Sequence, residues 1–99
     1  MEREADPNSL PELDLHGLEP TRALRRLAQE LHAARVRRAP GLVVVTGRGY
    51  GNRLQEPVLR GRVEAWLDGP EGRALGVVSW TRTSRGGALE VRLTTPGSP

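Results

Sequence analysis

One histidine and one nearby aspartate have the side-chain types and spacing that proton transfer requires. Asp14 and His16 are separated by a single residue, so both side chains fall on the same side of an extended strand. An imidazole gains or loses a proton near neutral pH, which suits a general acid or base. Asp14 could orient that imidazole, or it could hold a cation such as Mg²⁺ or Mn²⁺. The alternative is a structural role, in which His16 bonds to the backbone of a turn that includes Gly17.

A glycine-rich loop provides the second group of candidate residues. Thr46, Gly47, Arg48 and Gly49 follow an apolar run, and Tyr50 comes next. Free glycine amides can approach a phosphate closely, Arg48 would add positive charge, and Thr46 could hydrogen-bond the phosphate or a water. Tyr50 could stack on a base or pack on a neighbouring helix. The absence of Lys excludes a P-loop, and a tight strand-to-helix turn would explain the two glycines equally well.

The charge distribution favours a polyanionic partner such as DNA or RNA. Residues 1–19 carry one Arg against six acidic residues, whereas residues 20–99 carry 14 Arg against six. The planar arginine side chain can donate two parallel hydrogen bonds to a phosphate. Further candidates for contact with the nucleic-acid backbone are Arg53, Arg82 and Arg85. The alternatives are an ordinary solvated surface and the arginine-rich coding bias of a GC-rich genome.

Length and composition exclude several classes of protein. A chain of 99 residues accommodates one compact domain and no large cleft for an organic cofactor. The absence of Cys excludes disulfides, a cysteine nucleophile and thiolate metal sites. No apolar run approaches the ~20 residues that span a bilayer, and the first residues lack the pattern of a signal peptide. These features predict a soluble, cytoplasmic, monomeric protein that has no membrane association.

Six secondary-structure elements must position the candidate residues. Hydrophobic spacing predicts a strand over 13–15, a helix over 20–38, a strand over 42–45, a helix over 57–68, a strand over 74–81 and a strand over 89–93. Helices alternate with the first three strands, which favours parallel pairing of those strands through crossovers. A short turn at 86–87 makes the last two strands antiparallel.

The predicted fold is therefore α+β, a two-layer sandwich in the order βαβαββ, with a four-stranded mixed sheet and two helices. If the first two strands are parallel neighbours, His16 and Thr46 emerge at the same edge of the sheet, where ligands bind in crossover folds. Residues 12–93 form the predicted domain, residues 1–11 a flexible arm and residues 94–99 a flexible tail.

Four segments together resemble the small MutS-related (Smr) domain family. They are LDLHG at 13–17, TGRG at 46–49, V-L-x-x-x-V-x-x-W-L at 58–67 and the GG…V-x-L ending at 86–93. The resemblance implies a fold similar to the C-terminal domain of translation initiation factor three, nucleic-acid binding and, for several members, nicking of DNA or RNA. It also places Asp14 and His16 in the first family motif and residues 46–49 in the second.

The function that the resemblance implies is hydrolysis of phosphodiester bonds in structured DNA or RNA. The alternatives are a module that binds branched or structured nucleic acid without cleavage, and an adaptor that contacts no nucleic acid. One departure from the family concerns the last turn, where Gly86 and Gly87 run directly into Ala88 in place of the longer G-G-x-G-A. Any substrate contact that relatives make through that turn is in doubt in this chain.

Overall fold

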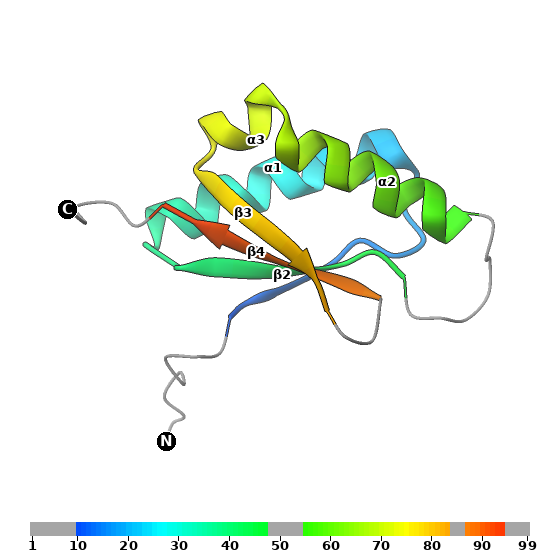
Figure 1. Cartoon of the computed structure of the whole chain (residues 1–99), viewed down its shortest axis with the longest axis horizontal. Coiled ribbons are helices and arrows are strands. Elements are labelled where there is room, and N and C mark those ends of the chain that lie inside the picture. The colour runs from blue at the N-terminus through cyan, green and yellow to red at the C-terminus, as the bar shows by residue number, and fades with distance from the viewer. Residues whose placement is uncertain (1–9, 48–54, 84–86, 95–99) are drawn as a thin grey trace, which may run out of the picture.

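Seven secondary-structure elements make up the described part of the chain. The computed structural model describes residues 10–47, 55–83 and 87–94. In chain order the elements are β1 (Glu12–Asp14), α1 (Pro20–Val36), β2 (Gly41–Val45), α2 (Gln55–Asp68), α3 (Pro70–Ala74), β3 (Val77–Arg82) and β4 (Ala88–Leu93). The strands form one sheet, and the helices lie together on one of its faces (Figure 1). The predicted α+β two-layer sandwich with a four-stranded mixed sheet is confirmed.

The order of the strands brings the carboxyl ends of β1 and β2 together. The sheet order is β1-β2-β4-β3. β1 pairs parallel with β2, and β4 is antiparallel to both of its neighbours, β2 and β3. β3 therefore runs in the same direction as β1 and β2 but pairs with neither, because β4 lies between β2 and β3. The predicted parallel pairing of the first three strands is correct only for β1 with β2.

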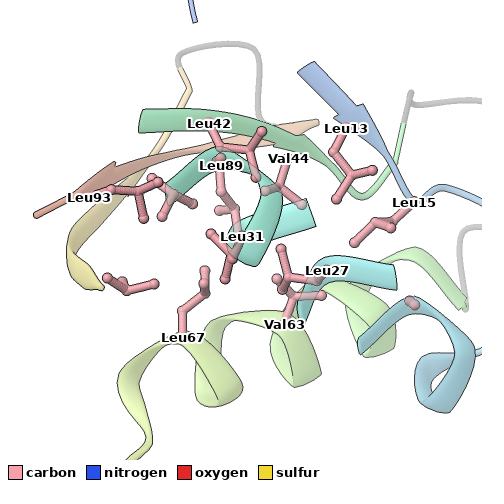
Figure 2. Packing of buried hydrophobic residues seen from close by; sticks show 14 of the residues in the cluster. Leu13, Leu15, Leu27, Leu31, Leu42, Val44, Val63, Leu67, Leu89 and Leu93 are labelled. Atoms are coloured by element: carbon pink, nitrogen blue, oxygen red, sulfur yellow. The ribbon is translucent and has the colours of Figure 1, made fainter. Parts of the chain in front are cut away.

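The core lies between the sheet and the helices. Side chains alternate between the two faces of a strand, so every second residue faces the helices. Figure 2 shows Leu13 and Leu15 on the same side as Leu27 of α1, and all three are almost fully buried. Asp14 and His16 occupy the intervening and following positions, and both are exposed. Burial of the two leucines thus keeps these polar side chains in solvent.

The first helix ends two residues earlier than its hydrophobic pattern predicts, at Val36. Arg38 has a φ of 61°, which lies in the left-handed region. The next amide, that of Ala39, donates to the carbonyl of Ala34 at 2.9 Å, and the amide of Arg38 donates to that of Arg35 at 2.9 Å. This arrangement is a Schellman motif, which satisfies the last helical carbonyls and usually has glycine at the position of Arg38.

A short helix that the sequence does not predict precedes the third strand. The predicted strand over 74–81 is wrong at its start, because residue 74 belongs to α3 and β3 begins at Val77. Pro70 is the first residue of α3, where its missing N–H costs nothing, so the residues that end α2 also begin α3. A Cβ at Gly72 would lie 2.6 Å from the carbonyl oxygen of Leu67, which explains the glycine. The described residues therefore form three helices and not the two predicted.

Candidate functional site

One edge of the sheet brings the two candidate segments together. Asp14, the last residue of β1, lies opposite Val45, the last residue of β2, in the parallel ladder. The amide of Leu15 donates to the carbonyl of Val45 at 2.7 Å, which extends the pairing one residue beyond β1. His16 and Thr46 therefore follow at the same edge of the sheet, as the sequence predicts.

Asp14 and His16 form a hydrogen-bonded pair at this edge. Asp14 Oδ1 lies 2.6 Å from His16 Nδ1 and also accepts the backbone amide of His16 at 3.0 Å. Because a carboxylate only accepts hydrogen bonds, Nδ1 carries the hydrogen, and Nε2 of the neutral ring keeps its lone pair. The side chain of His16 is 53% exposed and that of Asp14 is 39% exposed. The pair can therefore present a proton acceptor to a bound molecule.

The turn after His16 separates the pair from the first helix. Gly17 has a φ of 80°, a left-handed conformation that favours glycine. The amide of Leu18 donates to the carbonyl of Leu15 at 3.1 Å, and α1 then begins at Pro20. Because the chain turns here, His16 lies at the end of the strand rather than within the sheet.

The loop after β2 is bonded to the start of β4. The amides of Thr46 and Gly47 both donate to the carbonyl of Gly87, at 3.1 and 3.2 Å. The prediction of a free Gly47 amide for phosphate binding is therefore wrong for this structure, because that N–H already has an acceptor. Thr46 is only 2% exposed, so a hydrogen bond between its hydroxyl and a phosphate, as predicted, would require its surroundings to open.

Arg82 reaches the same edge from β3, but its guanidinium binds Glu64 of α2. Arg82 Nε donates to Glu64 Oε2 at 2.8 Å, and Nη2 donates to Oε1 at 3.1 Å. The two-point hydrogen bond and the charge of Glu64 raise the pKa of Arg82 above its ordinary value. The side chain of Arg82 remains 58% exposed, whereas that of Glu64 is 13% exposed. Arg82 thus joins β3 to α2, and a phosphate contact by its exposed side remains a prediction.

Glu64 and Asp68 are contact residues that sequence reasoning missed. Trp80 Nε1 donates to Asp68 Oδ1 at 2.8 Å, beside the pair of Arg82 with Glu64. The two carboxylates are four residues apart on a helix, and their two partners are two residues apart on a strand. Each spacing places both side chains on one side of its element. Two carboxylates four residues apart on a helix, with two hydrogen-bond donors two residues apart on a strand, form the sequence pattern that could have identified these two contacts.

Five of the predicted site residues lie outside the described residues. They are Arg48, Gly49, Tyr50, Arg53 and Arg85. The described residues nearest to them in the chain include Gly47, Thr83 and Gly87. The amide of Gly47 bonds to Gly87, and that of Thr83 bonds to the first residue of β4, so all three lie at the edge that carries His16. The roles of the five residues remain predictions.

The residues that the structure describes contain neither a preformed metal cluster nor a membrane-spanning helix. Within these ranges, no group of three or more His, Cys, Asp or Glu side chains is placed to hold a metal ion. A Mg²⁺ or Mn²⁺ at Asp14 would draw most of its oxygen ligands from phosphate and water. No helix in the same ranges is both long enough and apolar enough to cross a membrane.

Comparison with known proteins identifies the family. The model of the Smr domain family matches residues 13–93. The crystal structure of the Smr domain of Thermus thermophilus MutS2 is similar to this chain, with a TM-score of 0.68 and 28% sequence identity. The match covers 86% of this chain and 99% of that chain. A search of curated proteins finds no match. The resemblance carried by the four sequence segments is confirmed, and the chain belongs to the Smr domain family.

Proposed function

We propose that this Smr domain binds nucleic acid at the edge where β1 and β2 end and cleaves a phosphodiester bond there. The observation that carries the proposal is the 2.6 Å contact between Asp14 Oδ1 and His16 Nδ1 in a pair whose imidazole is exposed. A histidine that only caps a turn needs no carboxylate at Nδ1 and no solvent access. Exposure and orientation together therefore support proton transfer at Nε2.

In the proposed reaction His16 acts first as a base. Nε2 takes a proton from water while the water oxygen bonds to phosphorus and the bond from phosphorus to the leaving oxygen breaks. The leaving oxygen then takes a proton from the imidazolium or from solvent. Asp14 fixes the ring by accepting the Nδ1 hydrogen and stabilises the imidazolium that forms. Acid–base catalysis of this kind contributes about 10²- to 10⁴-fold to a rate.

Nucleic-acid binding without cleavage is the second candidate function. It is favoured because two protein groups that were predicted to bind phosphate are already hydrogen-bonded to other residues of the protein. The Gly47 amide donates to Gly87, and two nitrogens of Arg82 donate to Glu64. The Gly47 amide would have to leave Gly87, and Arg82 could offer only the N–H groups that Glu64 leaves unbonded, to stabilise charge at the phosphate. A module that only binds needs no such stabilisation.

Strand scission by matched histidine variants tests the catalytic proposal. The parent chain, His16→Ala and His32→Ala are incubated with supercoiled plasmid DNA and with a structured RNA, with and without Mg²⁺ or Mn²⁺. His32 is an exposed histidine of α1, so its variant controls for the loss of an imidazole. We expect His16→Ala to lose about 10²- to 10⁴-fold in rate and His32→Ala to keep the parent rate.

The other outcomes discriminate between the two candidates. Equal cleavage by the parent and His16→Ala would remove His16 from the mechanism. Salt-dependent binding by the parent with no scission under any of these conditions would favour the binding module. Scission that co-purifies with the chain and depends on His16 would exclude it.

A further inference from the structure

The solvent-facing side of α1 is basic and contains no acidic residue. Its exposed positions are Thr21, Arg22, Arg25, Arg26, Gln29, His32 and Val36. The three arginines occupy the first two turns of the helix. They are called here the arginine face of α1. No carboxylate in the described residues forms an ion pair with any of them.

This placement of charge is unfavourable for the helix itself. The first turn of α1 contains no acidic residue, although the amino end of a helix carries partial positive charge and favours carboxylates. Arg22 stands three positions after the cap residue Glu19, where Glu or Gln commonly completes a capping box. Arg22 also lies three and four residues from Arg25 and Arg26, the spacings at which like charges repel. One contact offsets part of this destabilisation: the Glu19 carboxylate accepts a hydrogen bond from the backbone amide of Arg22 at 3.3 Å.

The unfavourable charges lie next to the proposed site along the fold. Pro20, the first residue of α1, follows His16 by only four positions. Figure 1 shows the chain passing from the end of β1 to the near end of α1. At ~1.5 Å per residue the helix is about 25 Å long, and its three arginines fall within the half of it nearest the site. A local arrangement that weakens a helix, beside a candidate site, indicates a functional requirement for the charge.

We propose that the arginine face of α1 binds phosphates of the nucleic acid. These phosphates lie to one side of the phosphodiester bond that is cleaved beside His16. The inference rests on the proposed function, because the occupant of the face is the same nucleic acid. Guanidinium groups can donate two parallel hydrogen bonds to a phosphate, and the partner's charge removes the repulsion within the face. The face acts on affinity and not on the chemical step, since its residues are not placed at the reacting bond.

Two triple variants that remove equal charge test the proposal. Arg22, Arg25 and Arg26 are changed to Gln in one variant, which keeps helix propensity. The control changes Arg37, Arg38 and Arg73 to Gln. Arg37 and Arg38 follow the carboxyl end of α1, and Arg73 lies in the last turn of α3, so these exposed arginines are not part of the arginine face. Binding of a labelled duplex oligonucleotide and a labelled RNA hairpin is followed by anisotropy between about 50 and 200 mM salt. Thermal unfolding and steady-state cleavage are measured on the same samples.

The arginine-face variant is expected to bind at least about tenfold more weakly than the parent. The slope of its plot of log K against log salt concentration is expected to be smaller in magnitude by about 2 to 3. Its Tm is expected to equal or exceed that of the parent, and its KM to rise without a fall in kcat. The control is expected to keep most of the parent's affinity and salt dependence.

The outcomes separate this inference from the function on which it rests. If the parent binds and the two triple variants weaken binding equally, the effect is one of net charge, and the assignment of the face is overturned. Parent-like affinity in the arginine-face variant overturns it as well. If the face variant alone binds weakly while His16→Ala cleaves like the parent, the face stands and the proposed chemistry fails. A parent that binds neither probe overturns both.

Discussion

Arg82 and Glu64 join the edge strand of the sheet to the second helix through two hydrogen bonds. Nε and Nη2 of the arginine donate to the two carboxylate oxygens at 2.8 and 3.1 Å. One helical turn away, Trp80 donates to Asp68 at 2.8 Å. The two contacts fix how far β3 can slide along α2. The first contact also engages two of the three guanidinium nitrogens of Arg82 at the edge that carries His16.

Substitution of Glu64 by Gln tests whether this pair supports the fold or the site. We expect a slightly lower Tm, because water replaces much of the attraction lost by an exposed guanidinium. The pKa of Arg82 is raised by its hydrogen bond and ion pair with Glu64, so loss of the guanidinium's proton breaks the pair only at strongly alkaline pH. Affinity for nucleic acid should not fall, because the released guanidinium can bind phosphate.

Thermal unfolding and anisotropy measure these two effects. Glu71→Gln removes an exposed carboxylate from α3 and serves as the control. A large loss of affinity in Glu64→Gln without loss of stability would contradict the supporting role of Glu64 and place its carboxylate in contact with the ligand.

Asn at position 14 should impair catalysis without unfolding the domain. The amide has the size of the carboxylate but lacks the charge that stabilises the His16 imidazolium. We expect kcat to fall about 10²- to 10⁴-fold, because an amide in place of the carboxylate also allows the wrong tautomer of the imidazole. Glu12→Gln is the matched control, since Glu12 is exposed two residues earlier on the same strand. A parent-like kcat for Asp14→Asn would remove the orienting role of the carboxylate.

The same substitution at two helical glycines should have opposite effects. Gly72→Ala should destabilise the fold by about 1–3 kcal/mol, because the new Cβ would lie 2.6 Å from the carbonyl oxygen of Leu67 and neither backbone can move easily. Gly61→Ala should stabilise it by about 0.5–1 kcal/mol, because nothing lies within 4 Å of a Cβ there. Urea unfolding of both variants provides the comparison. A stabilised Gly72→Ala would show that α3 does not pack against the end of α2 as described.

Glycine at position 38 should stabilise the end of α1. Arg38 has a φ of 61°, and an L residue in that conformation costs roughly 1 kcal/mol more than glycine. We expect Arg38→Gly to raise the free energy of unfolding by about that amount. Arg38→Ala removes the same charge but keeps the Cβ, so it should give little gain. Equal stabilisation by the two variants would assign the effect to charge instead of backbone conformation.

The position of the Asp14–His16 pair was predictable from sequence because it depends on a period of two. Leu13 and Leu15 are buried, so the alternation places Asp14 and His16 in solvent whatever the helices do. The parallel pairing of the first two strands follows from the helix between them. The first feature rests on residues that are adjacent in the chain, and the second on the general rule for strands joined by a helical crossover.

The contacts that the sequence does not reveal join residues that are distant in the chain. The acceptor of the Gly47 amide, Gly87, is 40 positions away, and it reaches β2 only because β4 is inserted between β2 and β3. The partner of Arg82 is 18 positions away, on a helix. The short helix α3 was missed for a different reason, since Pro70 both ends one helix and begins another. No local pattern determines which of these outcomes occurs.

The carbonyl of Gly87 gives the candidate site a mechanical property. It accepts the amides of two successive residues, Thr46 and Gly47, from the neighbouring strand. The exit of β2 and the start of β4 therefore separate only when both hydrogen bonds are broken, and a movement of the Gly87 carbonyl affects solvent exchange of both amide hydrogens. A displacement of β4 is in this way transmitted to the residue that precedes Arg48 without passing through the core.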